Sequence, residues 1–516
     1  MATNQDSIHQ NQSNDPGYEL KQLLNPPESS TPKNHSIKIN SDELSTNNKK
    51  EHSKSTSNAS SQPPEILEKI FTKEEQTSVR IFINSLTKGI PTSFTYADYY
   101  YCLLTLKILI GFTPDITLFA ATAYQTSYFA VFMLCMITGV IDAHSNSGAQ
   151  AYGRKDYKKV NLYLRQSLVV AFTLFLAFVA TPTLFVEKVL LAVKVEPELA
   201  AQSQRLIMIS LPAIFMRILN DNIKAFLQNQ GYLQEIGVAA ISMFVVFLPV
   251  SHWLIITLKL GGVGFALSLF IYETGCCLLC LLIVKIKCPV EVLDCSEPLF
   301  DSILYYYKYT ASIFLTRLTA FLCWNVTTLM LGSYSTPADL AAFTTAFNIS
   351  ETCYASSRGV VVYIGTIINQ KLGEGKLKEA KELFTRCFKI NILFSIVFAS
   401  MFGLIAGSLV FFGAFESAEV AERFKPLVFV VLLNSFIVCN YNMCIKIIYS
   451  HGYMKQLTLA QVCDVIMLPI NFYFSCILGF GSLTGYLCPM FGLYSKVMVC
   501  LYYLFYAIDW MEFDSF

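Results

Sequence analysis

The chain has 516 residues, of which 54% are hydrophobic and only 15% are charged, with a mean hydropathy of +0.47. Soluble domains carry roughly 25% charged residues, so this composition excludes a water-soluble globular surface. The formal net charge of +1 gives no indication of a nucleic-acid partner. The sixteen cysteines are scattered, many inside apolar runs, and none has the spacing of a zinc site, so we expect neither a metal site nor a disulfide framework.

The first part of the chain differs from the rest. Residues 1–78 are rich in Asn, Ser, Gln, Pro and Lys and contain few apolar residues, so we interpret them as a disordered cytosolic tail. Within it, Glu19 followed by Leu23 and Leu24 has the spacing of an acidic dileucine sorting signal, which would bind a sorting adaptor. This pattern favours a eukaryotic plasma membrane or an endolysosomal or vacuolar membrane, and leaves the choice between them open.

From about Arg80 to Tyr506 the chain is almost continuously apolar. A spanning helix needs about 20 mostly apolar residues, and Gly, Pro and charged residues divide this region into twelve such spans. The predicted spans are 80–110, 114–145, 160–186, 200–229, 235–259, 263–286, 300–333, 339–370, 382–412, 425–450, 456–479 and 482–507. We therefore predict an all-α multi-pass membrane protein with an N-lobe at 79–290 (spans 1–6), a C-lobe at 291–508 (spans 7–12) and a short cytosolic C-terminus at 509–516.

The loops predict the orientation of these spans. The loop after span 2 is basic over 154–159, and the loop after span 8 is basic over 371–386. The loop after span 9 instead carries glutamates. By the positive-inside rule the two basic loops face the cytosol, and an even number of spans then places both termini there.

One short pattern occurs twice, 220 positions apart. The first copy has Gln150, Tyr152, Gly153, Tyr157 and Lys158, and the second has Gln370, Leu372, Gly373, Leu377 and Lys378. Because the offset is six spans long, the two halves have the same orientation, which predicts a parallel repeat about a pseudo-twofold axis normal to the bilayer. Two such lobes rocking around a central cavity form an alternating-access transporter.

Several motifs occur in a characteristic order. They are Gly139 with QAYG from Gln150 and YLRQSL at Tyr163–Leu168, Pro212 with FLQNQG at Phe226–Gly231, LGGVGFAL at Leu260–Leu267, QKLGEGKLKEAK at Gln370–Lys381, and Asp509-Trp510. Over about residues 80–512 the chain resembles the multidrug and toxic compound extrusion (MATE) family. The motif positions that we expect to be structural are Pro91, Gly139, Gln150, Gly153, Pro212, Gln228, Gln370 and Gly373.

The resemblance implies an antiporter that exports amphipathic, usually cationic, organic solutes in exchange for H⁺ or Na⁺. Two alternatives stay open: a related flippase for lipids or oligosaccharides, and a non-transporting membrane scaffold or sensor. An enzyme is not expected, because the sequence has no phosphate-binding loop and no nucleophile–base spacing among its six histidines. We expect a monomer with no cofactor beyond the coupling ion, whose partners are a small organic substrate and the bilayer.

The family's proton-binding carboxylates are missing. By the resemblance, their positions fall on Leu106, Ser145, Leu322 and Thr327 in this chain. Ionisable residues inside membrane spans are costly and are functional candidates by default. Our candidates for ion coupling are therefore the acidic residues at bilayer depth: Asp98, Glu351, Asp464 and Glu273.

The same charges have structural interpretations. Arg317 in span 7 is expected either to pair with Glu351 or Asp464 or to act in transport, where a fixed cation would favour an anionic substrate. Glu273 either faces the inner cavity or pairs with Lys107. Two further residues, Asp142 and Asp221, lie near the predicted cytosolic span ends and are expected to be hydrated or to cap helices.

The candidates for the substrate cavity lie mainly in span 7: Trp324, Asn325, Thr327 and Arg317. In a cavity, Trp324 would hold a flat organic cation by a cation–π contact, a position that the resemblance also implies. The alternative for the aromatic residue is packing between helices, and for Asn325 and Thr327 it is ordinary hydrogen bonding between helices.

Overall fold

The structure is a computed structural model, and it describes residues 73–113, 116–192, 195–289, 293–412, 418–508 and 510. The sorting signal at Glu19, Leu23 and Leu24, most of the predicted tail and Asp509 lie outside the described residues. The prediction that the tail extends to residue 78 is wrong at its end, because a helix already begins at Lys73.

The N-lobe consists of α-helices, several of which continue into a short π-helical segment. In chain order they are α3 (Lys73–Asn84), η1 (Ser85–Gly89), α4 (Ile90–Gly111), α5 (Ile116–Phe129), η2 (Ala130–Leu134), α6 (Cys135–Gly153), α7 (Tyr157–Leu174), η3 (Phe175–Ala180), α8 (Thr181–Thr183), α9 (Val186–Ala192), α10 (Pro197–Asn229), α11 (Leu233–His252), η4 (Trp253–Thr257) and α12 (Gly261–Lys287).

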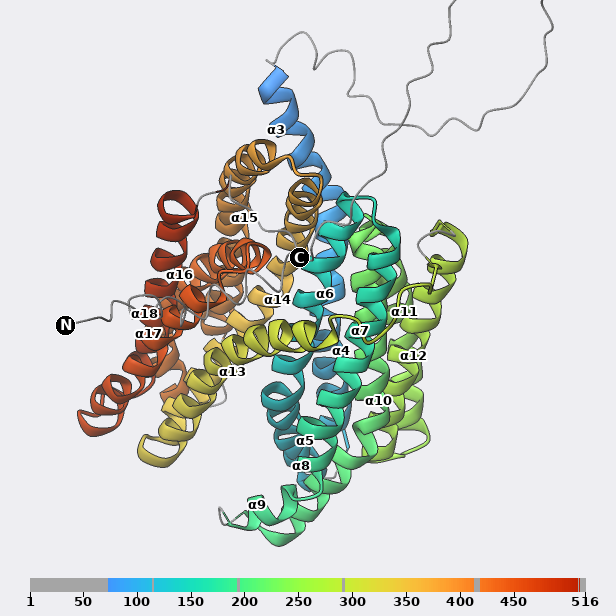
Figure 1. Ribbon diagram of the computed structural model, residues 1–516. Helices are drawn as coiled ribbons and strands as arrows, with labels where there is room; N and C mark the ends of the chain where they lie inside the picture. Colours follow the sequence, from blue (N-terminus) through green and yellow to red (C-terminus); the bar gives the residue numbers. More distant parts are fainter. Residues whose placement is uncertain are drawn as a thin grey trace, which may run out of the picture. The chain divides into compact units, whose positions relative to one another are not determined.

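The C-lobe has fewer and longer helices. They are α13 (Ile303–Tyr334), α14 (Pro337–Gly373), α15 (Leu377–Phe411), α16 (Ala418–Ser450), α17 (Met454–Phe472), η6 (Tyr473–Ile477), α18 (Gly481–Tyr502) and η7 (Tyr503–Ala507). In Figure 1 the helices α14–α18 lie together on one side and α4–α12 on the other, with α13 passing from beside α6 toward α17.

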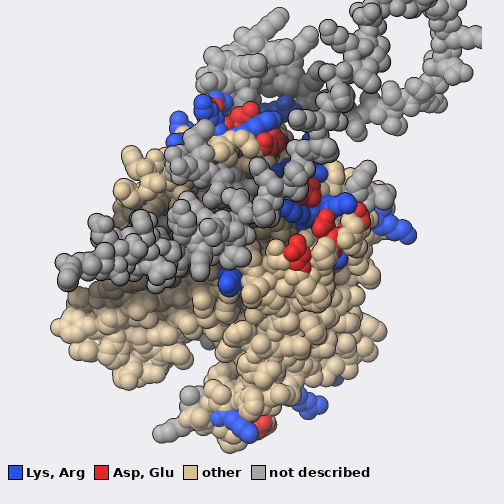
Figure 2. All heavy atoms as spheres, viewed as in Figure 1, with Lys and Arg blue, Asp and Glu red and all other residues tan. Residues whose placement is uncertain are grey.

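The prediction of an all-α membrane fold is confirmed, and each predicted span corresponds to one continuous helix, in which adjoining α- and π-helical segments count together. In the described part of the chain, ten of these continuous helices are long and apolar enough to cross a membrane. The helices of spans 1 and 8, which contain α4 and α14, are less apolar than these ten because they carry more hydroxyl and charged side chains. In the face shown in Figure 2, charged side chains gather toward the two ends and a broad band between them is almost free of charge, as a lipid-facing surface requires.

The 220-residue repeat is confirmed in the backbone. The amide of Arg154 donates to the Gln150 carbonyl (3.1 Å), and the amide of Glu374 donates to the Gln370 carbonyl (2.9 Å). Each turn then has one residue in the left-handed region, at Lys155 and at Gly375. In the second turn Lys376 and Lys371 hold the pKa of the Glu374 carboxyl below its usual value.

A second pair of turns follows the same offset. The π-helical segments η4 and η6 are 220 residues apart, and the hydrogen bond from the Leu260 amide to the Leu254 carbonyl recurs between Phe480 and Phe474. The turns after η4 and η6 therefore share one geometry, although they are not part of the basic loops. A second matching pair at the same offset indicates a structural repeat and not only two similar loops.

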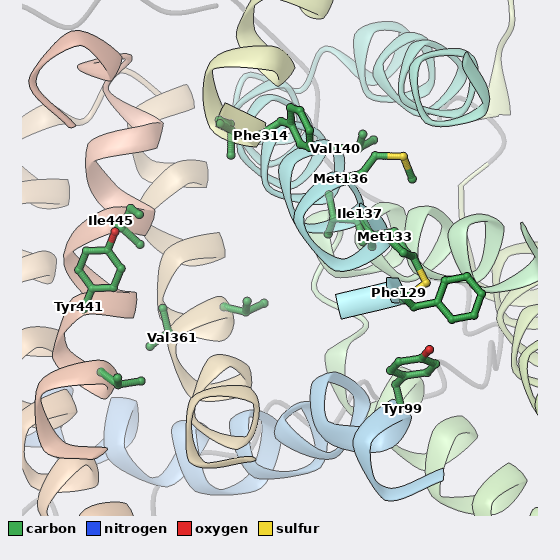
Figure 3. Packing of buried hydrophobic residues seen from close by; sticks show 14 of the residues in the cluster. Tyr99, Phe129, Met133, Met136, Ile137, Val140, Phe314, Val361, Tyr441 and Ile445 are labelled. Carbon is green, nitrogen blue, oxygen red and sulfur yellow. The ribbon is translucent and has the colours of Figure 1, made fainter. Parts of the chain in front are cut away.

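The lobes contact each other through α4 against α14 and through α6 against α13 and α14. The helices cross closely: a Cβ at Gly359 of α14 would lie 2.0 Å from the Ser93 backbone nitrogen of α4, and one at Gly139 of α6 would lie 3.0 Å from the Phe314 Cα of α13. Figure 3 shows buried residues on both sides, with Val361 and Tyr441 in the C-lobe and Met136 in the N-lobe. Small residues thus allow two apolar lobes to approach along their length.

We expect Gly359→Ala to destabilise the protein by about 1–3 kcal/mol, because the added methyl group overlaps backbone that cannot rotate away. Thermal unfolding of the purified protein in detergent measures the effect. The matched control is Gly407→Ala in α15, where the nearest atom to a new Cβ is 3.8 Å away. Equal melting temperatures for the two variants would contradict the close crossing of α4 and α14.

Candidate functional site

The N-lobe holds a cluster of buried charges around Asp98 of α4. The Asp98 carboxylate accepts hydrogen bonds from Arg217 (3.3 Å), Lys224 (3.0 Å) and the Tyr272 hydroxyl (3.1 Å). Asp98 is fully buried, so its negative charge depends on these partners. This proposed coupling residue is therefore bound by two cations that belong to the protein itself.

The same cluster includes Glu273 of α12 and Asp221 of α10. Glu273 accepts from Arg217 (2.9 Å), so the expected pair with Lys107 is wrong. Asp221 pairs with Arg217 Nε (3.2 Å) and with Lys224 (3.5 Å), and it is buried, contrary to the expectation of a hydrated or capping residue. Positions 217, 221 and 224 recur at helical spacing, which puts all three side chains on one face of α10.

A second cluster joins the two lobes at Asp142 of α6. Its carboxylate accepts from Arg317 of α13 (2.9 Å) and Arg358 of α14 (3.2 Å), and Lys446 of α16 lies 3.9 Å away. The expectation that Arg317 pairs with Glu351 or Asp464 is wrong, and so is the expectation of a hydrated Asp142. One buried N-lobe carboxylate instead holds three C-lobe cations.

Glu351 of α14 differs from the other candidate carboxylates. Its Oε2 is shielded from solvent and has no hydrogen-bond partner in the described part of the chain. No ion pair is formed by its carboxylate among the described residues, although Arg317 lies near enough to act on it electrostatically. The sequence marks Glu351 as a candidate because of its depth in the bilayer. The structure adds that, among the described residues, its carboxylate forms none of the ion pairs that bind the other candidate carboxylates.

The remaining coupling candidate lies inside the C-lobe. Asp464 of α17 accepts a hydrogen bond from Lys496 of α18 at 2.5 Å, and both side chains are buried. Trp324 lines a small pocket beside this pair. Its ring stacks on Phe347 with 5.1 Å between ring centroids, so it packs within the C-lobe.

The other cavity candidates of α13 make local contacts. The Asn325 side chain donates to the Phe321 carbonyl of its own helix (2.8 Å). Thr327 accepts from Asn471 of α17 (3.0 Å), which is a hydrogen bond between helices. Of the four residues proposed for the substrate cavity, Arg317 is the one that reaches the interface between the lobes.

A pocket of about 50 Å³ lies between the lobes at the middle of the helices. Both lobes line it with charged residues, Arg217 and Asp221 from α10 and Arg358 from α14. Three tyrosines complete much of the wall: Tyr96, Tyr100 and Tyr354. This pocket is the candidate functional site, because both lobes line it and both contribute charged residues.

The lobes are joined near the two basic turns by a reciprocal contact. Gln150 Nε2 donates to the Ser450 carbonyl (3.0 Å), and Gln370 Nε2 donates to the Asn229 carbonyl (2.8 Å). A Cβ at Gly153 would lie 2.1 Å from the Gln370 carbonyl oxygen, and one at Gly373 would lie 2.1 Å from that of Gln150. We call these contacts the glutamine latch.

The other family-motif positions contribute to packing near the site. Gln228 accepts a hydrogen bond from the Tyr96 hydroxyl (2.8 Å) and donates to Ser145 (3.2 Å). Pro91 packs against Gly237, where a Cβ would lie 2.6 Å from the proline ring. Pro212 lies inside α10 one turn before Arg217, where it removes one helical hydrogen bond.

Three C-lobe cations of the buried clusters were not singled out from the sequence: Arg358, Lys446 and Lys496. The signal was present, because each is a basic residue inside an apolar span, and such residues need a partner. Acidic residues are the usual ion-coupling groups, but in this chain the buried cations that hold them are equally part of the site.

Two repeated six-helix lobes with an ionisable pocket between them define a multi-pass membrane transporter. A family model described as MatE matches residues 91–253 and 312–475, one segment in each lobe and more than half of the chain together. The chain therefore belongs to the MatE family of transporters. This confirms the resemblance found in the sequence and favours transport over the scaffold or sensor alternative.

Individual relatives are distant. Protein DETOXIFICATION 13 of Arabidopsis thaliana is 21% identical over 342 residues, which cover 63% of this chain and 68% of that protein. Multidrug and toxin extrusion protein 2 of Mus musculus is 28% identical over 133 residues, covering 25% of this chain and 22% of that protein. The crystal structure of the eukaryotic MATE transporter AtDTX14 has a TM-score of 0.78 at 14% identity, covering 84% of this chain and 97% of that one. At this identity the structural likeness shows the fold alone.

The Asp464–Lys496 pair allows a clean test of the buried charges. Asp464→Asn or Lys496→Met alone should each destabilise the protein by about 3–5 kcal/mol, because one buried charge loses its partner. The double variant should lose clearly less than the sum of the two. Thermal unfolding in detergent measures all three, with Glu422→Gln, which alters an exposed pair with Lys425, as the control. Additive losses would show that the two side chains do not form an ion pair.

Proposed function

We propose that the chain is a secondary active antiporter that moves an organic solute across its membrane in exchange for H⁺ or another cation. The observation that carries this proposal is the ionisable pocket, which is lined by two lobes of one structural repeat. A site shared by two like-oriented bundles can be exposed to either side of the membrane by a rocking motion of the bundles.

The glutamine latch supports alternating access. It closes the lobes at the end that carries the basic turns after α6 and α14, where Gly153 and Gly373 permit direct backbone contact. If these turns face the cytosol, as their basic charge predicts, the pocket is separated from the cytosol by the latch and by the cluster at Asp142. Transport then requires both groups of contacts to break and re-form in each cycle.

Glu351 is the coupling residue that we propose. Asp98, Glu273 and Asp464 are each bound by Arg217, Lys224 or Lys496, so protonating one of them would leave a buried cation with a weaker partner. Protonation of Glu351 breaks no ion pair in the part of the chain that the structure describes. Its position on α14, two turns before Arg358, places it near the interlobe pocket.

We expect Glu351→Gln to abolish solute uptake driven by a pH gradient in reconstituted vesicles and to preserve exchange of labelled for unlabelled solute. Exchange uses the transport cycle without net proton movement, so the two assays separate coupling from transport. An exposed residue of α15 supplies the control, Glu382→Gln, which should behave as the unaltered protein. Undiminished pH-driven uptake by Glu351→Gln would refute the assignment.

A further inference from the structure

The interlobe pocket presents one guanidinium group from each lobe. Arg217 and Arg358 both line it, and Asp221 is the one carboxylate among its described lining residues. Asp221 is already bound by Arg217 (3.2 Å) and Lys224 (3.5 Å). The C-lobe wall that a bound solute would contact is therefore cationic, whereas the N-lobe wall presents Arg217 together with the carboxylate that it pairs with.

The charged groups behind the C-lobe wall of the pocket also have an excess of positive charge. Arg317, Arg358 and Lys446 gather around Asp142, and adding the nearby Glu351 still leaves three positive groups against two negative ones. Buried charges are stable only when they have partners. The interlobe cluster is thus one negative charge short of balance on the side of the pocket formed by α13, α14 and α16.

The N-lobe carries the opposite excess, and two of its three carboxylates lie away from the pocket wall. Its cluster has three carboxylates, Asp98, Asp221 and Glu273, for the two cations Arg217 and Lys224. Asp98 and Glu273 do not line the pocket, and the Arg217 side chain contacts both of them. On the N-lobe side, a solute in the pocket therefore meets the Arg217 guanidinium group and its partner Asp221, with Asp98 and Glu273 behind the guanidinium group.

Aromatic rings supply the rest of the wall. The Arg358 guanidinium lies 5.0 Å from the ring centre of Tyr96 and 5.9 Å from that of Tyr354, and Tyr100 lines the same pocket. Tyrosine faces offer stacking surfaces for a flat ring. Guanidinium groups bind carboxylate and sulfonate oxygens through two parallel hydrogen bonds.

We propose that the solute is an aromatic organic anion, a flat ring bearing a carboxylate or sulfonate that binds between Arg217 and Arg358. This inference rests on the proposed transport function and specifies the substrate class of the same pocket. An anion there would supply the charge that the interlobe cluster lacks, whereas a cation would face two guanidinium groups and a carboxylate that is already paired.

Two probes that share one ring system but carry opposite permanent charges test the sign of the charge on the transported solute. The full-length protein, reconstituted in vesicles, should transport 2-naphthalenesulfonate and should fail to transport (naphthalen-2-ylmethyl)trimethylammonium. Neither probe crosses a bilayer by losing its charge. Transport of the ammonium probe but not of the sulfonate would overturn the anion inference and leave the transport function standing. This comparison uses the unaltered protein and so does not depend on any variant folding.

Arg358→Gln tests the site itself. It leaves Asp142 paired with Arg317 and Lys446, and it should reduce sulfonate uptake and calorimetric affinity by about tenfold or more, with partial rescue in Arg358→Lys. The matched control is Arg423→Gln, an exposed arginine near Asp339. Sulfonate binding without transport would keep the anion site and refute the transport function. An absence of both binding and transport, or full uptake in Arg358→Gln, would overturn the inference.

Discussion

One carboxylate, that of Asp142, binds cations from three helices of the other lobe and so holds the two lobes together. Arg317, Arg358 and Lys446 come from three helices of the C-lobe, and in the absence of Asp142 they would place like charges side by side in a medium of low dielectric constant. The attraction of the N-lobe carboxylate for all three makes the closed arrangement of the lobes electrostatically favourable. The interface thus depends on an unequal division of charge between the lobes, and not only on apolar packing.

The unequal division of charge between the lobes affects how they can move apart. When the lobes separate, Asp142 and the three cations must exchange their mutual contacts for water or for a ligand, because an unpaired buried charge costs several kcal/mol. The glutamine latch adds contacts to the backbone at the end of the same helices. Ion pairs and close packing therefore both hold the lobes together along α6 and α14. A solute that brings its own charge into the pocket changes the balance between the two arrangements, which is how binding and movement become coupled.

The sequence predicted the fold well, because the features that define it are local or periodic. Hydropathy marks the spans, basic turns mark their ends, and the 220-residue offset requires no knowledge of packing. The partners of the charged residues were predicted poorly. Depth in the membrane follows from position along a span, but the identity of the facing helix depends on the rotation of each helix about its axis. Arg317 was therefore assigned to Glu351 or Asp464 when its partner is Asp142.

Asp142 itself was misplaced for a simpler reason. The predicted span ended at residue 145, which would put this carboxylate at the membrane surface, whereas α6 continues to Gly153. Gly153 lies eleven residues after Asp142, which is about 16 Å of helix at 1.5 Å per residue, so Asp142 is buried about three turns from the helix end. The polar stretch between Asp142 and Gly153 looked like the beginning of a loop because its Ser, Asn and Gln side chains are poor in hydropathy. In the folded protein Ser145, Asn146 and Gln150 form hydrogen bonds with Lys446, Asn369 and the Ser450 carbonyl of the other lobe.

The buried carboxylates of this chain are mostly held by buried cations. Asp98 and Asp464 are bound by lysines of neighbouring helices, Lys224 and Lys496. Protonating a carboxylate that has a lysine or arginine at about 3 Å would leave that buried cation with a weaker partner. Within the described chain, that leaves Glu351 as the in-span carboxylate whose charge can change without breaking an ion pair. In the proposed antiporter, this carboxylate would therefore be the place where a proton is exchanged.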